Sequence, residues 1–249
     1  MKDGLPTRDR TWALFLDVDG TLLDLVESPE AVHAPEELLQ TLAATAARED
    51  GALALVSGRS LEQLDRIFAP RRFCAAGLHG LERRKADGEV VPPTIERTAL
   101  DQARTRLADV VARHPGLLLE DKGLSLALHF RRAPHLEPEA RHAMTSVSAA
   151  AGPDFHLQEG KCVIELKPAG ATKRTAIEAF MAEAPFAGRL PVFAGDDVTD
   201  EDGFAAVNEL GGHSIRVGNG EASCATYRVA TVAALRDWLE SLRPSGAMP

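Results

Sequence analysis

Three short apolar segments, each followed directly by polar residues, constrain the fold of this chain more than any other feature. They are residues 12–16, 51–56 and 190–194. Continuous apolar runs of this length are typical of strands that are covered on both faces. Segments with apolar residues at helical spacing, such as 35–48 and 61–68, separate the strands. This alternation predicts a parallel sheet with right-handed crossovers and helices on both faces, an α/β fold.

Polar residues follow four predicted strands, at the edge where open α/β sheets bind ligands. They are Asp17 and Asp19, Ser57 and Arg59, His79, and the group Asp196, Asp197 and Asp200. Asp17 and Asp19 are two residues apart, so both side chains point the same way if the strand geometry continues. Read alone, the pair could equally form a turn, a role in which aspartate is common. Joint placement at neighbouring strand ends favours a functional site.

The chemistry that suits these residues is phosphoryl transfer. Crowded carboxylates repel one another, which predicts a bound cation, and oxygen ligands favour Mg²⁺ over zinc. Asp17 would attack phosphorus and form an aspartyl phosphate. Asp19 would protonate the leaving alkoxide and then deprotonate the attacking water. Ser57 and Lys173, which lies at the start of a predicted helix, would stabilise charge on the transferred group.

The middle of the chain has a different pattern. Residues 124–131 alternate between apolar and polar side chains, and predicted helices cover about 94–113 and 137–150. This pattern predicts a small antiparallel sheet with one face covered by the two helices and one polar face. We therefore expect an α+β domain at 81–167, inserted into a core domain formed by 1–80 and 168–249. A polar sheet face could be no more than a solvated surface.

Composition narrows the class of partner. The 249 residues carry a formal net charge of −9, which disfavours general binding to nucleic acid or to anionic membranes. The three cysteines have no zinc-like or paired spacing, and the first ten residues lack the apolar core of a signal peptide. We therefore expect a cytoplasmic protein that acts on a small molecule. The oligomeric state is open, with a monomer favoured.

The combined motifs resemble those of the haloacid dehalogenase superfamily of phosphohydrolases. Asp17-Val18-Asp19-Gly20-Thr21 is similar to the first motif, Ser57 to the second, Lys173 to the third and Gly195-Asp196-Asp197 to the fourth. The resemblance implies a Rossmann-like doubly wound core with an inserted C2-type cap domain. One departure is Arg174, which stands where the family usually has glycine.

A narrower set of motifs resembles the trehalose-6-phosphate phosphatases. It includes Ser57-Gly58-Arg59, Gly77-Leu78-His79-Gly80 and the segment from Gly160 to Glu165. This resemblance implies hydrolysis of trehalose 6-phosphate with Asp17 as nucleophile and Asp19 as acid and base. The metal ligands would be Asp17, Asp19 through its carbonyl group, and Asp196. The implied substrate-binding residues are Arg59, His79, Glu120, Lys122, Arg131, Lys161 and Glu165.

Other functions use similar residues. A phosphatase of the same superfamily could act on sucrose phosphate or mannosyl phosphoglycerate, and a mutase would return the phosphoryl group to a sugar. A non-catalytic sensor of sugar phosphates is a further alternative. The presence of Asp17, Asp19, Lys173 and Asp196 argues against a sensor, because a sensor has no need of the acid and base.

Overall fold

The computed structural model describes residues 4–8, 10–25, 32–92, 97–160, 162–219 and 222–243. The chain forms two compact units. The first, which we call the core unit, comprises Met1–Pro93 and Ala171–Pro249, and the second, the inserted unit, is Thr94–Gly170. Within the described residues, no helix has both the length and the apolar character needed to cross a membrane.

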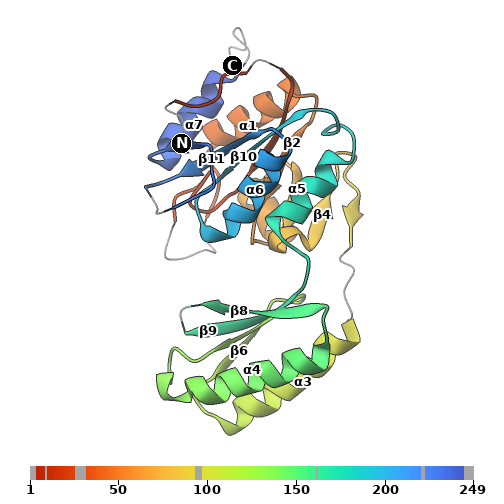
Figure 1. The fold of residues 1–249 in the computed structure, drawn as a ribbon, viewed down its shortest axis with the longest axis vertical. Coiled ribbons are helices and arrows are strands. Elements are labelled where there is room, and N and C mark those ends of the chain that lie inside the picture. Colours follow the sequence, from red (N-terminus) through yellow and green to blue (C-terminus); the bar gives the residue numbers. More distant parts are fainter. Residues whose placement is uncertain are drawn as a thin grey trace. The chain divides into compact units, whose positions relative to one another are not determined.

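Among the described residues, eight strands form the sheet of the core unit, in the order β12-β11-β10-β1-β2-β3-β4-β5 (Figure 1). Their bounds are β1 Trp12–Leu16, β2 Leu53–Val56, β3 Cys74–Gly77, β4 Glu82–Arg84, β5 Val90–Val91, β10 Leu190–Gly195, β11 His213–Val217 and β12 Tyr227–Val229. The strands from β12 to β3 are parallel, and the hairpin β4–β5 is antiparallel.

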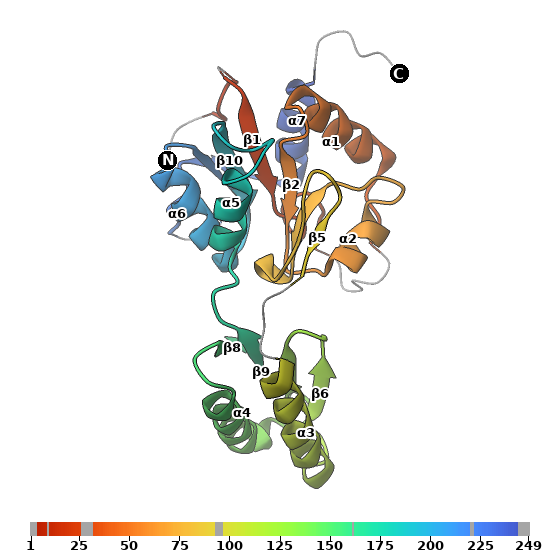
Figure 2. The same ribbon diagram turned by 90° about the vertical axis from the view of Figure 1, so that its right-hand side faces the viewer.

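Helices cover both faces of this sheet (Figure 2). They are α1 Glu36–Arg48, α2 Leu61–Ile67 and α7 Val232–Ser241 on one face, and α5 Lys173–Met181 and α6 Glu201–Glu209 on the other. The side chains of β1 alternate between the two layers: Leu14 packs with the first set of helices and Phe15 with the second. The predicted α/β class with a doubly wound sheet is therefore confirmed.

The hairpin β4–β5 lies in a different unit from the one we expected. The sequence places the start of the inserted domain at residue 81, but the unit begins at Thr94 and ends at Gly170. The reason is strand pairing: Ala75 to Gly77 of β3 pair with Glu82 to Arg84, so the hairpin extends the core sheet. A hairpin signal identifies the turn but does not reveal which sheet edge receives it.

The inserted unit is a four-stranded antiparallel sheet with two long helices on one face. Its elements are α3 Arg97–Arg113, β6 Leu118–Asp121, β7 Leu126–His129, α4 Glu137–Ala151, β8 Phe155–Gly160 and β9 Val163–Pro168. Leu126, Leu128 and Ile164 face the helices and form its hydrophobic core. The alternate residues of the same strands form the opposite, polar face.

Candidate active site

The strand ends that carry the predicted motifs are neighbours in the core sheet. The order β10-β1-β2-β3 places the carboxyl ends of these four strands side by side. Backbone hydrogen bonds continue the pairing past the strands: Asp17 N–H donates to the carbonyl of Ala194 at 3.0 Å, and Ser57 N–H donates to Ala76 at 2.9 Å. Asp17 and Ser57 therefore lie at one edge of the sheet, as the sequence predicts.

The ammonium group of Lys173 lies between two buried carboxylates. Its Nζ donates to Asp17 Oδ1 at 2.7 Å and also to Asp200 Oδ1. The capping box of Thr172 and Thr175 starts α5 at Lys173, which fixes where this side chain leaves the helix. All three charged residues are at most 5% exposed. One ammonium against two carboxylates leaves a negative charge unbalanced at this site.

Burial perturbs the titration of these groups. It raises the pKa of Asp17 to about 7, an effect that Lys173 opposes and Asp200 reinforces. Burial acts to lower the pKa of Lys173, but the two carboxylates outweigh it, and its pKa lies above the usual value. Lys173 is therefore protonated at neutral pH, where its charge favours the ionised form of Asp17.

Asp19 has a different environment from Asp17. Arg59 donates to both of its oxygens, from Nε to Oδ2 at 2.7 Å and from Nη2 to Oδ1 at 2.6 Å. The hydrogen bonds to Asp19 raise the pKa of the Arg59 guanidinium. The Asp19 side chain is 33% exposed and that of Asp17 is 7% exposed. The two aspartates of one motif thus have separate cationic partners.

Ser57 and His79 lie on adjoining turns. The Ser57 side chain is buried, and its Oγ accepts a hydrogen bond from the Arg59 N–H at 3.2 Å. The His79 N–H donates to the Ser57 carbonyl at 2.9 Å, and His79 has a left-handed backbone with φ of 58°. A Cβ at Gly58 would lie 2.8 Å from His79 Nε2, so glycine is required there for the ring to approach.

Three carboxylates could hold a metal ion. Asp17, Asp196 and Asp200 each offer an oxygen, and these oxygens lie within 4.8 Å of one another. Asp200 already accepts hydrogen bonds from Lys173 and from the N–H groups of Asp196 and Asp197. Asp196 Oδ1 accepts one from Thr21 Oγ1 at 3.0 Å. Asp17 and Asp196 are therefore better suited than Asp200 to bind a cation.

The electrostatics of Asp196 also favour a cation. Burial raises its pKa, and the charges of Asp200 and Asp197 add to the increase while the hydrogen bond from Thr21 opposes it. A divalent cation relieves such crowding, and an oxygen-only ligand set suits a hard cation. The residues present therefore fit the expected metal. The expected ligand from Asp19 is its main-chain carbonyl, which stays a prediction.

The inserted unit brings together part of the predicted sugar-binding set. The register Glu120–Ala127–Glu165 places both glutamates on the polar face of the sheet. Lys122 Nζ lies 3.3 Å from Glu165 Oε2, and Ser125 Oγ donates to Glu165 Oε1 at 2.5 Å. Burial acts to raise the pKa of Glu165, but the hydrogen bond from Ser125 and the charge of Lys122 outweigh it, and the pKa falls below its usual value.

Arg131 and Lys161 complete the predicted substrate-binding set. Arg131 is exposed and follows the end of β7, while Lys161 lies outside the described residues. Sequence reasoning did not assign roles to Asp200, to Thr21 or to His129, whose Nε2 lies 2.8 Å from Glu120 Oε2. Asp200 lies in the acidic run at 196–202, and Thr21 lies in the Asp17–Thr21 motif. The hydrogen bonds that give them a role join residues far apart in the chain.

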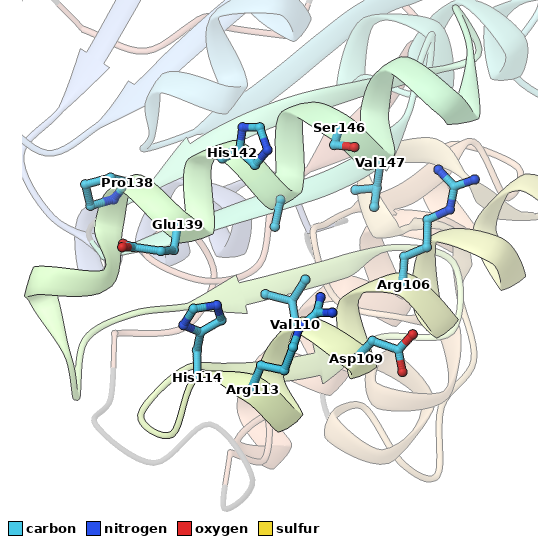
Figure 3. Close-up of a pocket in the computed structure, with 11 residues that line it drawn as sticks. Arg106, Asp109, Val110, Arg113, His114, Pro138, Glu139, His142, Ser146 and Val147 are labelled. Atoms are coloured by element: carbon cyan, nitrogen blue, oxygen red, sulfur yellow. The ribbon is translucent and has the colours of Figure 1, made fainter.

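A groove of about 560 Å³ lies in the inserted unit between α3 and α4 (Figure 3). Val110, Ala143 and Val147 contribute apolar side chains, and the charged side chains of Arg106, Asp109, Arg113 and Glu139 are among those along it. None of the predicted site residues lines it.

Comparison with known proteins decides the family. A family model for trehalose-phosphatase matches residues 15–233. The chain belongs to the trehalose-phosphatase family. As a member of this family it is a phosphatase, and the resemblance to the trehalose-6-phosphate phosphatases is confirmed. The matched region contains all of the candidate site residues described above, from Asp17 to Asp200.

Individual relatives of the family agree with this assignment. The trehalose-6-phosphate phosphatase of Escherichia coli K12 is 46% identical over 241 residues, which cover 95% of this chain and 88% of that protein. A probable trehalose-phosphate phosphatase of Sinorhizobium fredii is 47% identical over 207 residues, covering 83% and 78%. The crystal structure of a trehalose-6-phosphate phosphatase related protein has a TM-score of 0.73 and 29% identity, and the match covers 92% of this chain and 96% of that one.

Arg174, the departure from the family pattern, does not displace Lys173. Its guanidinium donates to Glu209 with two bonds of 2.8 Å and to Glu178 at 3.3 Å. These contacts hold the arginine between α5 and α6 while the neighbouring lysine contacts Asp17 and Asp200. The structure thus accommodates the arginine through ion pairs outside the carboxylate site.

Gly20→Ala tests how closely the first motif approaches Asp196. Gly20 has φ of +79°, and a Cβ there would lie 2.1 Å from Asp196 Oδ2. We expect at least a tenfold loss of phosphatase activity, because the alanine displaces the Asp196 carboxylate. Gly188→Ala is the matched control, since Gly188 has φ of +76° and no atom within 4 Å of its Cβ position.

Both variants should lose about 1–2 kcal/mol of stability from the left-handed backbone, measured by urea unfolding. Only Gly20→Ala should lose activity in a phosphate-release assay. Equal activity of the two variants would contradict the close approach.

Proposed function

We propose that this protein hydrolyses trehalose 6-phosphate to trehalose and phosphate, with Mg²⁺, through an aspartyl phosphate on Asp17. The observation that carries the proposal is the buried group of Asp17, Lys173 and Asp200 at the strand ends. A lysine held against one oxygen of a buried aspartate supports a nucleophilic carboxylate. The names of the close relatives support the choice of substrate.

The first chemical step forms the covalent intermediate. Asp17 attacks phosphorus, and the bond from phosphorus to the sugar O6 breaks as the new bond forms. The proton of Asp19 passes to the departing oxygen, which leaves as the hydroxyl group of trehalose. Ser57 and Lys173 donate to oxygens of the transferred phosphoryl group, and Lys173 keeps Asp17 ionised beforehand.

The second step releases phosphate. Asp19, now a carboxylate, takes a proton from water while the water oxygen attacks phosphorus. The bond between phosphorus and the Asp17 oxygen breaks, which regenerates the carboxylate. Asp19 thus ends the cycle protonated, as it began, and no further reactant is required.

The metal site would use residues that the structure brings together. Asp17 and Asp196 would hold Mg²⁺ through their side chains and Asp19 through its carbonyl, with Asp200 orienting Lys173 and the backbone at Asp196 and Asp197. The cation would neutralise negative charge on the phosphate group. Thr21 and Gly20 would keep the Asp196 carboxylate in place.

We further propose that the two units divide the work, the core unit carrying the phosphoryl chemistry and the inserted unit recognising the sugar. The polar face of the inserted sheet presents donors and acceptors close together, including Lys122, Ser125 and Glu165. A polyhydroxylated ligand requires such pairs, because each hydroxyl group both donates and accepts. Glu120, Arg131 and Lys161 would add to this set, and His79 would contact substrate from the core unit.

A phosphate-release assay over a panel of sugar phosphates tests the function. We expect trehalose 6-phosphate to be hydrolysed faster than sucrose 6-phosphate, mannosyl phosphoglycerate or glucose 6-phosphate. Asp17→Asn should abolish the activity while leaving the circular dichroism spectrum unchanged, because the amide is a poor nucleophile of the same shape. Preference for another sugar phosphate would replace the substrate, and near-normal turnover by Asp17→Asn would refute the nucleophile.

Removal of divalent cations should stop turnover, and Mg²⁺ should restore it. A second measurement does not depend on activity: Mg²⁺ should raise the melting temperature of the wild-type protein, because binding to the folded state stabilises it. The increase should be lost in Asp196→Asn. Indifference of both activity and melting temperature to chelation would exclude the metal role.

Glu165→Ala tests sugar recognition. The loss of a hydrogen bond to a charged group, worth about 1.5–3 kcal/mol, should lower kcat/KM for trehalose 6-phosphate by at least about tenfold. Hydrolysis of 4-nitrophenyl phosphate, which has no sugar, should be nearly unchanged. Glu159→Ala is a control in the same sheet, because Glu159 pairs with Arg141 on the helix side. Equal losses on both substrates would argue against sugar recognition by Glu165.

A further inference from the structure

Two nitrogens of the Arg59 guanidinium donate hydrogen bonds to the same carboxylate, that of Asp19. Nε donates to Asp19 Oδ2 at 2.7 Å and Nη2 donates to Asp19 Oδ1 at 2.6 Å, so the planar guanidinium binds the planar carboxylate edge to edge. This bidentate geometry fixes the carboxylate in orientation as well as in position. The Arg59 side chain is only 13% exposed, which reduces the competition from water for these bonds.

The backbone at Arg59 is held by two hydrogen bonds and by the helix cap that follows it. Its N–H donates to Ser57 Oγ at 3.2 Å, and its carbonyl accepts from Leu78 N–H at 2.9 Å. The next residue, Ser60, is the N-cap of α2 and forms a capping box with Gln63. The guanidinium therefore projects from a turn that is anchored to the residue after β3 and to the start of α2, and a well-anchored donor can orient its partner.

The contacts of Arg59 add a second role to the one that its sequence motif suggests. Resemblance to the family implies that Arg59 contacts substrate, which stays a prediction, and the structure directs its fork to Asp19. Lys173 donates one bond to Asp17 and shares its charge with Asp200, whereas Arg59 donates two bonds to Asp19, so the two aspartates of the motif have different cationic partners. The difference matters because Asp19, unlike Asp17, is partly exposed and must be oriented without close packing.

We propose that Arg59 is a positioning residue for Asp19. Its two hydrogen bonds hold the Asp19 carboxyl group in the orientation from which the proton passes to the leaving oxygen and from which it is later taken from water. Arg59 itself exchanges no proton and breaks no bond. This inference rests on the proposed function, since it concerns the acid and base of that reaction.

Arg59→Lys is the variant that tests this role, because lysine keeps the charge and loses the fork. We expect kcat for trehalose 6-phosphate to fall about ten- to a hundredfold, part of the contribution that general acid–base catalysis makes, with KM changed less than threefold. Arg83→Lys is the matched control. Arg83 forms a similar bidentate pair with Glu183, its side chain is 12% exposed, and it carries no role in the proposed reaction.

A comparison of leaving groups separates positioning from a merely structural role. In a single turnover, Arg59→Lys should release 4-nitrophenolate from 4-nitrophenyl phosphate at close to the wild-type rate, because this leaving group departs without a proton. Arg59→Gln, a second variant, should show the same pattern. Both variants should unfold within a few degrees of Arg83→Lys. An equal loss on both substrates, or a rise in KM at constant kcat, would overturn the positioning role.

The double variant Asp19→Asn with Arg59→Lys completes the test. If Arg59 acts through Asp19, the double variant should hydrolyse trehalose 6-phosphate within twofold of Asp19→Asn alone. Losses that multiply would show an independent role and overturn the proposal. Asp17→Asn measured alongside keeps the outcomes distinct: if it stays active the proposed mechanism fails, and if it is inactive while the losses multiply only the role of Arg59 fails.

Discussion

The contacts of the buried Lys173 ammonium group are the interaction on which the candidate catalytic edge of the core unit depends. It joins Asp17, which follows β1, to Asp200, which lies before α6, through hydrogen bonds that span 156 and 27 residues. Removing one partner of such a group leaves an uncompensated buried charge, which costs about 3–5 kcal/mol. The same contact that stabilises the folded edge also supports the ionised state of Asp17.

Asp200 shows how one side chain organises several others. It is fully buried, and its two oxygens accept from Lys173 and from two consecutive backbone N–H groups. A Cβ at Gly195 would lie 2.3 Å from Asp200 Cγ, so the strand end must be glycine for the carboxylate to reach this position. The turn that presents Asp196 is thereby fixed, which supports a role for Asp196 in holding a cation.

The two aspartates of the first motif are differentiated by their surroundings. Asp17 is buried beside an ammonium, and Asp19 is partly exposed beside a guanidinium. A nucleophile must be ionised, whereas an acid and base must exchange a proton with a leaving group and with water. In the proposed reaction Asp17 is the nucleophile and Asp19 the acid and base, and the greater exposure of Asp19 leaves it accessible to a leaving group and to water. In the inserted unit, Glu165 is likewise held by Ser125 and Lys122 on a polar sheet face.

The sequence by itself determined the α/β class, the inserted antiparallel unit and the strand ends that carry the motifs, because apolar periodicity and turn chemistry are local properties. Tertiary structure decided what depends on long-range pairing. Pairing of β4 with β3 makes the hairpin β4–β5 part of the core sheet. The packing of distant segments also brings Asp200 into contact with Lys173 and Asp19 into contact with Arg59. Residue spacing cannot reveal these partners, since they meet only when distant segments pack together.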